Sequence, residues 1–401
     1  MLKAFLLRVS RTSAGVEPLR AQGLQSSLDL GGCSVQKRLI SADSHVAEND
    51  ETYAEIDPRY RDVRPRAAYK EERGGAIFTV PNLPMAEGVP MGLVCTAGRP
   101  PEDFGKPRRW EELHPAGHDP KARLALQDED GIAAEVIYPS MGMVLCNHPD
   151  IDFRKACFDA YNRWILRFHE ADPDRLVMLP QLGLRTVKEG IAELEDAKRL
   201  GYRGVMLSGN AAFHDYDHPD YDPFWRACVE LNLPVSFHIL TSRGDIGDHQ
   251  RGHKIIQHLI TIRGNQDLMS MMIFGGVFER HPKLKIICVE ADAGWVPHFK
   301  YRMDHTFERH RHWQKFGAIS RMPSEYFDEN IYVTFQDDYS VKYALPGMRA
   351  DRILWASDFP HSDGTYPFTA RIVNELIAPM STDVAERILS LNTAELYGLA
   401  A

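Results

Sequence analysis

The chain has 401 residues, of which 44% are hydrophobic and 26% are charged, and its formal net charge is -9. This composition excludes a disordered chain, and the negative balance argues against nucleic acid as a partner. No run of about 18 or more apolar residues occurs, so we expect no transmembrane helix and no membrane partner. The six cysteines form no Cys-x-x-Cys pair, which fits a reducing compartment, and we predict a cytoplasmic protein.

Residues 1–37 differ in character from the rest. Apolar and basic residues up to Arg11 are followed by a segment rich in Ser and Gly. The apolar run is short for a secretory signal, and Arg8 interrupts it. We therefore expect a flexible N-terminal extension over 1–37, with a targeting peptide as the alternative, and one folded domain over 38–401.

From residue 38 onward, short apolar runs alternate with longer amphipathic ones. The segment 186–201 is of the second kind, with apolar residues at helical spacing and a terminal glycine. Eight runs have the composition of buried strands: 38–45, 133–139, 176–182, 204–208, 233–240, 285–291, 330–335 and 352–357. Eight alternating strand and helix units predict an α/β fold of the closed (β/α)8, or TIM-barrel, type. A doubly wound open sheet is the alternative, but no Gly-x-Gly-x-x-Gly follows a strand.

The connection between the first strand and the helix near 121–130 is far longer than usual. Its runs Ala76–Val80 and Met91–Cys95 look like strands separated by a turn region. We expect residues 46–120 to form a lid insertion, a hairpin folded over the barrel mouth, with a peripheral ornament as the alternative. A polar loop after the fifth strand carries further candidate substrate contacts, namely Arg243, His249 and His253.

Side chains of metal-ligand type stand at the ends of four predicted strands. They are Asp43 and His45 at the first, His238 at the fifth, Glu290 at the sixth, and Asp358 with His361 at the eighth. Residues at positions i and i+2 of a strand share a face, so Asp43 and His45 can converge on one point. Alone, Asp358 would fit an ordinary turn. Together, carboxylates and imidazoles at the mouth of a barrel predict a centre for zinc, manganese or iron(II).

Six stretches, taken in order, resemble the amidohydrolase superfamily. They are Ile40–Val46, Val235–Ile239, Gly275–Lys285, Glu290–Pro297, Ser357–Asp363 and Leu391–Gly398. More narrowly, they are similar to its amidohydrolase-2 branch, which includes aminocarboxymuconate-semialdehyde decarboxylase and resorcylate-type decarboxylases beside many metal-dependent hydrolases. The resemblance covers about residues 38–400, and it implies an enzyme that acts on a small molecule.

The resemblance also implies residue roles. Asp43-x-His45 is similar to the first-strand metal motif, His238 to the fifth-strand ligand, and Asp358 to an aspartate that binds metal and takes a proton from water. The decarboxylase relatives carry a histidine after the sixth strand, where this chain has Glu290. Three carboxylates around one divalent ion would leave the site negative, so one ion with Glu290 as acid or base and two bridged ions both stay open. Zinc is the expected ion, with manganese or iron as alternatives.

These features favour metal-dependent hydrolysis of an amide, ester or thioester in a small aromatic or hydrophobic substrate. In this hypothesis Asp358 deprotonates a metal-activated water, and Glu290 or His361 returns the proton to the leaving group. The alternative is non-oxidative decarboxylation of an aromatic or unsaturated carboxylic acid, which we expect Glu290 to disfavour because a carboxylate is a poor proton donor. A barrel without catalysis is a third possibility. We further expect a homodimer.

Overall fold

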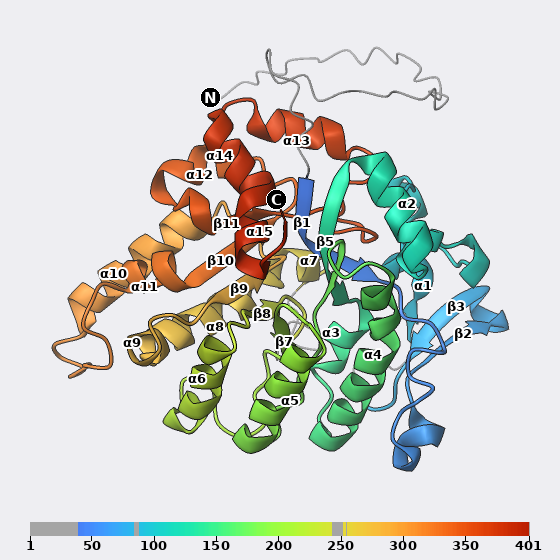
Figure 1. Ribbon diagram of the computed structural model, residues 1–401, viewed down its shortest axis with the longest axis horizontal. Helices are drawn as coiled ribbons and strands as arrows, with labels where there is room; N and C mark the ends of the chain where they lie inside the picture. The colour runs from blue at the N-terminus through green and yellow to red at the C-terminus, as the bar shows by residue number, and fades with distance from the viewer. Residues whose placement is uncertain (1–38, 84–87, 243–251, 254, 401) are drawn as a thin grey trace, which may run out of the picture. The chain divides into compact units, whose positions relative to one another are not determined.

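Eight parallel strands occupy the centre of the molecule (Figure 1). The computed structural model describes residues 39–83, 88–242, 252–253 and 255–400. The strands are β1 (Leu39–Val46), β5 (Ile132–Pro139), β6 (Leu176–Met178), β7 (Val205–Leu207), β8 (Val235–His238), β9 (Ile286–Val289), β10 (Ile331–Phe335) and β11 (Ile353–Trp355). Each overlaps a predicted apolar run, several being shorter than predicted, and all their residues except Ala133 are buried. Burial on both faces explains why these strands read as continuous apolar runs.

The strands form two sheets, and these sheets meet at both of their edges. One sheet has the order β1-β5-β6 and the other β11-β10-β9-β8-β7. Gln181, after β6, forms a parallel bridge with Met206 of β7. At the other edge, the amide of Asp358 donates to the carbonyl of Asp43 (3.0 Å), and the amide of His45 donates to the carbonyl of Phe359 (2.6 Å). The described residues therefore establish an α/β fold whose parallel strands follow one another in chain order.

Helices connect the strands and lie outside them (Figure 1). They are α2 (Pro120–Asp130), α3 (Met141–Leu145), α4 (Ile151–Ala171), α5 (Val187–Arg199), α6 (Asp222–Glu230), α7 (Ile256–Ile260), α8 (Ile262–Phe274), α9 (Val277–Arg280), α10 (Val296–His310), α11 (Pro323–Asn330), α12 (Val341–Ala344), α13 (Thr369–Ile377), α14 (Thr382–Glu386) and α15 (Asn392–Tyr397). Helix α2 begins after Asp119, whose carboxylate accepts from two backbone amides, and ends before Gly131, whose φ of +75° suits glycine. These caps fix the helix that faces the first and second parallel strands.

The insertion between β1 and α2 holds a small antiparallel sheet of β2 (Arg66–Lys70), β3 (Gly75–Thr79) and β4 (Val89–Pro90). The predicted strand Ala76–Val80 corresponds to β3. The strand predicted at Met91–Cys95 was wrong: Met91–Val94 forms the short helix α1, because a short apolar run fits either structure. The predicted lid is not supported. Instead, the insertion is bonded to the loop after β11, where the amides of Thr96 and Ala97 donate to the Pro360 carbonyl.

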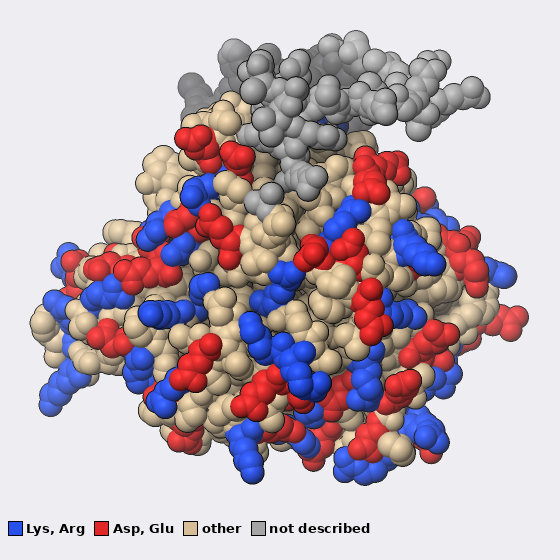
Figure 2. Space-filling view, in the orientation of Figure 1, with Lys and Arg blue, Asp and Glu red and all other residues tan. Residues whose placement is uncertain are grey.

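Other predictions concern the surface and the ends of the chain. The extension 1–37, Arg243 and His249 lie outside the described residues, whereas His253 is exposed. In the described part of the chain, no helix combines the length and hydropathy of a membrane span. Figure 2 shows basic and acidic side chains interspersed over the face that it draws, so neither sign of charge dominates that face.

Candidate metal centre

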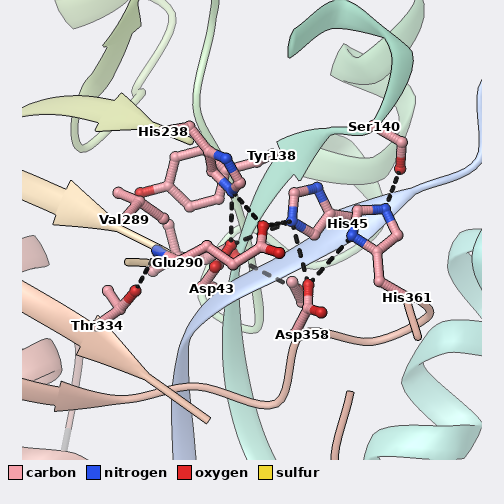
Figure 3. A network of polar contacts seen from close by, with 12 residues as sticks. Asp43, His45, Tyr138, Ser140, His238, Val289, Glu290, Thr334, Asp358 and His361 are labelled. Atoms are coloured by element: carbon pink, nitrogen blue, oxygen red, sulfur yellow. Dashed lines mark hydrogen bonds and ion pairs between the residues drawn. The ribbon is translucent and has the colours of Figure 1, made fainter. Parts of the chain in front are cut away.

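The predicted site residues converge at the C-terminal ends of the parallel strands (Figure 3). The Nε2 atom of His45, on β1, lies 3.4 Å from Asp43 Oδ1, 3.6 Å from Glu290 Oε2 and 3.4 Å from Asp358 Oδ1. The Nε2 atom of His238, the last residue of β8, lies 3.5 Å from Asp43 Oδ1 and 3.2 Å from Glu290 Oε2. Strands far apart in the sequence thus bring two imidazoles and three carboxylates to one point.

Two overlapping groups within this cluster have the spacing of metal ligands. One consists of Asp43, His45, His238 and Glu290, and the other of His45, Glu290, Asp358 and His361. In each group, one ligand atom from every residue lies within 4.8 Å of all the others. The structure therefore brings all six predicted site residues together, and their roles as ligands or as acids and bases remain predictions.

The backbone turns sharply where two of these carboxylates leave their strands. Glu290 directly follows β9 with a φ of +57°, and Asp358 follows β11 with a φ of +50°. Left-handed φ values are uncommon outside glycine. The amide of Glu290 donates to the Thr334 hydroxyl (2.8 Å), which helps to hold this turn. Because strained backbone persists only where the surroundings enforce it, these two outliers support a functional site.

Both imidazoles direct their Nε2 atoms into the cluster. The Nδ1 atom of His45 lies 3.0 Å from the carbonyl oxygen of Pro139, and that of His238 lies 3.1 Å from the carbonyl oxygen of Ile239. A carbonyl only accepts hydrogen bonds, so each Nδ1 carries a proton, and Nε2 is the atom that each ring could offer to a metal. Metal-binding histidines in proteins have this outer hydrogen bond.

The atoms that face one another in the cluster lack hydrogen-bond partners. They are His45 Nε2, His238 Nε2, Glu290 Oε2 and both side-chain oxygens of Asp43 and of Asp358. All are buried, and none has a hydrogen bond with any residue in the described part of the chain. Burying polar atoms without partners costs free energy. A divalent cation would offset this cost by accepting electron pairs from these nitrogen and oxygen atoms. The residues present therefore fit a metal ion.

Electrostatics in the cluster shift the pKa values in opposite directions. Burial works against ionisation of Asp43, but the imidazoles of His238 and His45 lower the pKa of this carboxyl below its usual range. Burial, reinforced by the charges of Glu290 and Asp43, raises the pKa of Asp358 well above the usual value. Burial would lower the pKa of His45, yet Asp43 and Glu290 raise it to about 9. Protons thus compensate part of the charge, and binding of a metal would release them.

His361 stands at the edge of the cluster, and each of its ring nitrogens lies close to a polar atom. Its Nδ1 lies 3.2 Å from Asp358 Oδ1, and its Nε2 lies 2.8 Å from the Ser140 hydroxyl (Figure 3). The single hydroxyl proton of Ser140 goes to the carbonyl of Val46 (2.7 Å), so His361 Nε2 is the donor to Ser140. The ring also stacks on His45, with centroids 3.9 Å apart. Sequence analysis missed Ser140, because a serine after a strand carries no distinctive signal.

The chain is similar in sequence to a known family and to known enzymes. A family model described as Amidohydrolase matches residues 111–399. The chain is 25% identical over 291 residues to the gamma-resorcylate decarboxylase of Rhizobium radiobacter, covering 68% of this chain and 85% of that protein. It is also 26% identical over 202 residues to the decarboxylase orsB of Emericella nidulans. That match covers 47% of this chain and 60% of the relative, less than two thirds of its length.

Solved structures show the same fold. An amidohydrolase from Mycobacterium avium subsp. paratuberculosis superimposes with a TM-score of 0.73 at 21% identity, covering 91% of this chain and 98% of the other. A dihydroxybenzoic acid decarboxylase from a Polaromonas species, solved with bound manganese and the inhibitor 2-nitroresorcinol, gives a TM-score of 0.60 at 19% identity, covering 90% and 97%. At these identities the likeness is one of fold.

The comparisons overturn the expectation of hydrolysis, since both curated relatives are named decarboxylases. Divalent metal centres built from carboxylates and imidazoles serve several chemistries, so the ligand set did not separate the two reactions. Zinc is not confirmed either, because the solved relative holds manganese. With the family model matching 111–399, well over half of the chain, this protein belongs to the amidohydrolase superfamily, in its amidohydrolase-2 branch.

Proposed function

We propose that the protein is a metal-dependent decarboxylase of a small aromatic or unsaturated carboxylic acid. The observation that carries this proposal is the cluster of buried carboxylate and imidazole atoms that lack partners among the described residues. The decarboxylase names of the curated relatives support it. An amidohydrolase barrel that binds no metal would leave this cluster unexplained.

We also infer that the two parallel sheets are parts of one closed (β/α)8 barrel. The parallel bridge from Gln181 to Met206 and the backbone bond from Asp358 to Asp43 support closure at the two edges. In such a barrel the C-terminal ends of the strands form the active site. Residues 38–401 would then form one catalytic domain after an extension over 1–37, and a homodimer stays a prediction.

Asp43, His45, His238 and Asp358 would hold one divalent ion, and we assign Glu290 to the same shell because its Oε2 faces both imidazoles. Manganese is the proposed ion, in line with the solved relative. When bound, a divalent ion offers positive charge to the carboxylate and to a neighbouring hydroxyl of the substrate. The buried carboxylates of the protein carry the opposite charge and would hold the ion in place.

Decarboxylation breaks the bond between the ring carbon and the carboxylate, and the electron pair stays on the carbon as carbon dioxide leaves. That carbon must then take a proton. We assign the proton to the pair formed by Asp358 Oδ1 and His361 Nδ1, which lie 3.2 Å apart. A carboxylate and an imidazole at this distance can share one proton, so the pair can supply it while Asp358 remains an anionic ligand of the metal. Ser140 accepts a hydrogen bond from Nε2, on the side of the ring away from Asp358, and so orients the imidazole of His361.

The test is a search for carbon dioxide release by the manganese-loaded protein. The substrates are hydroxylated benzoates, starting with the 2,6-dihydroxybenzoate that is bound in another solved relative. We expect carbon dioxide and the corresponding phenol in equal amounts, with loss of activity on chelation. Cleavage of esters or amides without carbon dioxide release from any carboxylated phenol would contradict the proposal.

A further inference from the structure

We infer that the buried ion pair between Arg123 and Glu135 is a positioning pair, which holds His45 and Asp358 in place from behind the metal centre. The inference rests on the proposed function only in taking these two residues as metal ligands. Arg123 comes from α2 and Glu135 from β5, and neither belongs to the cluster itself.

The pair is fully removed from solvent. Arg123 Nη1 lies 3.0 Å from Glu135 Oε2, and the two side chains are 0% and 2% exposed. A buried ion pair is seldom more stabilising than apolar side chains of similar volume, because both charges lose their hydration. Stability alone is therefore a weak explanation for the pair, and the groups that it contacts provide a better one.

Arg123 bonds directly to the backbone of a proposed ligand. Its Nη2 donates to the carbonyl of His45, and its Nε donates to the carbonyl of Ala116 (2.7 Å). The guanidinium carbon also lies over the ring of Phe359, 4.5 Å from the centroid. Phe359 directly follows Asp358, so one rigid planar group braces β1 and the loop after β11 together.

Glu135 reaches the same loop from the other side. Its Oε2 also accepts from Gln127 (2.8 Å), and its Oε1 accepts from the hydroxyl of Ser357 (3.4 Å), the residue before Asp358. The amide of Ser357 donates to the Ser41 hydroxyl (2.8 Å), and that hydroxyl in turn donates to the carbonyl of Asp43 (2.7 Å). Each proposed ligand on β1 and after β11 is thus tied at its backbone to this network.

The chemistry of the cluster explains why such a brace is needed. Oxygen atoms of Asp43, Glu290 and Asp358 lie 3.4, 3.6 and 3.4 Å from the same atom, His45 Nε2, and like charges this close together repel one another. A ligand set under this repulsion keeps its geometry only on a rigid support. In other metal sites, loss of such outer contacts weakens metal affinity by roughly 10–100-fold.

The deciding experiment measures Mn²⁺ affinity rather than activity. In the double variant Arg123→Met/Glu135→Leu neither charge is left unpaired, so the fold can survive the change. Chelator-treated protein is titrated with Mn²⁺ by electron paramagnetic resonance, and thermal unfolding is followed without metal. We expect about 10–100-fold weaker binding by the double variant. The matched control is Lys300→Met/Asp328→Leu, which removes a 2.6 Å ion pair between α10 and α11, and it should bind Mn²⁺ like the wild type.

A gentler variant guards against loss of the fold. Arg123→Lys keeps the charge, but a compact ammonium cannot bond at once to Glu135 and to the carbonyls of His45 and Ala116. We expect it to fold and to bind Mn²⁺ several-fold more weakly. Folded variants with wild-type affinity, or an equal loss in the control pair, would overturn the inference. Wild-type protein that binds Mn²⁺ but releases no carbon dioxide would refute the decarboxylase alone, whereas wild-type protein that binds no Mn²⁺ would refute both.

Discussion

Two groups of buried charges lie back to back in this molecule, and they are arranged in opposite ways. In the first, the side-chain oxygens of Asp43 and Asp358 face other acceptors and lack hydrogen-bond partners among the described residues. In the second, Arg123 and Glu135 use every polar atom of their side chains. The paired group can stabilise a fixed backbone on its own, while the unpaired group needs a cation. The presence or absence of hydrogen-bond partners thus distinguishes a structural ion pair from a candidate metal site, although both contain buried charged residues.

The contrast also has an electrostatic side. In the unpaired group, burial and neighbouring carboxylates raise the pKa of Asp358 well above the usual value, which opposes the ionisation of this carboxyl in the metal-free protein. Such shifts concentrate at functional sites because burial and like charges are placed together there. The following changes test whether the two groups have the different tasks that their contacts indicate.

The largest effect is expected when the unpaired group loses the carboxyl of Asp358. Asp358→Asn removes a proposed metal ligand and the proposed proton donor together, so we expect kcat for carbon dioxide release to fall by roughly 10²–10⁴-fold. The control is Asp383→Asn on α14, an exposed carboxylate whose loss should leave kcat unchanged. An Asp358→Asn variant with more than about a tenth of wild-type activity would refute the assignment.

Loss of one imidazole should weaken the binding of the metal. His238→Ala removes a ligand from the end of β8, and we expect Mn²⁺ affinity to fall by at least about 100-fold, the upper end of what outer contacts contribute. Isothermal titration calorimetry of chelator-treated protein measures the change. His214→Ala removes an exposed histidine and serves as the matched control. Equal affinities in the two variants would place the metal elsewhere.

Glu48 shares a feature with each of the two groups. One of its carboxylate oxygens accepts a hydrogen bond, and the other, Oε2, has no partner among the described residues. Glu48 is fully buried, its Oε1 accepts from the amide of Gly142 (2.9 Å), and burial raises its pKa from 4.5 to about 7. The native state therefore keeps a proton that the unfolded state has already lost, so this group makes the protein less stable as pH rises from about 4.5 to about 7. The loss amounts to about 3 kcal/mol at about 1.4 kcal/mol per pH unit.

Glu48→Gln keeps the hydrogen-bond acceptor and cannot ionise. We expect it to remove this part of the pH dependence, so that the variant gains stability relative to the wild type between pH 5 and pH 8. Urea unfolding at the two pH values measures the difference. Parallel pH profiles for wild type and variant would show that Glu48 ionises at its ordinary pKa in the folded protein.

The smallest effect concerns the orientation of His361. Ser140→Ala removes the acceptor of its Nε2 proton. Because such a hydrogen bond contributes about 1 kcal/mol, we expect kcat to fall by roughly 5–10-fold with unchanged Mn²⁺ affinity. Ser140→Thr keeps the hydroxyl and should restore most of the rate. A parallel loss of Mn²⁺ affinity would instead assign Ser140 to the support of the metal ligands.

The sequence predicted the unpaired group better than the paired one. Strand-ending carboxylates and histidines stand out against apolar runs, so Asp43, His45, His238 and Asp358 could be grouped before any coordinates. Arg123 could not, since a charged residue in an amphipathic helix is typical of a solvated face. Its partner Glu135 sits in an apolar run, and their pairing depends on how α2 packs on β5. The reaction also escaped prediction, because the proposed ligands suit more than one chemistry.

The most direct test of the central claim is anomalous diffraction from crystals grown with Mn²⁺ and measured at the manganese absorption edge. The account predicts one strong peak within bonding distance of His45 Nε2, His238 Nε2 and carboxylate oxygens of Asp43 and Asp358. No peak in this cluster, or a peak only at the exposed group of His214, His218 and Asp220, would contradict it.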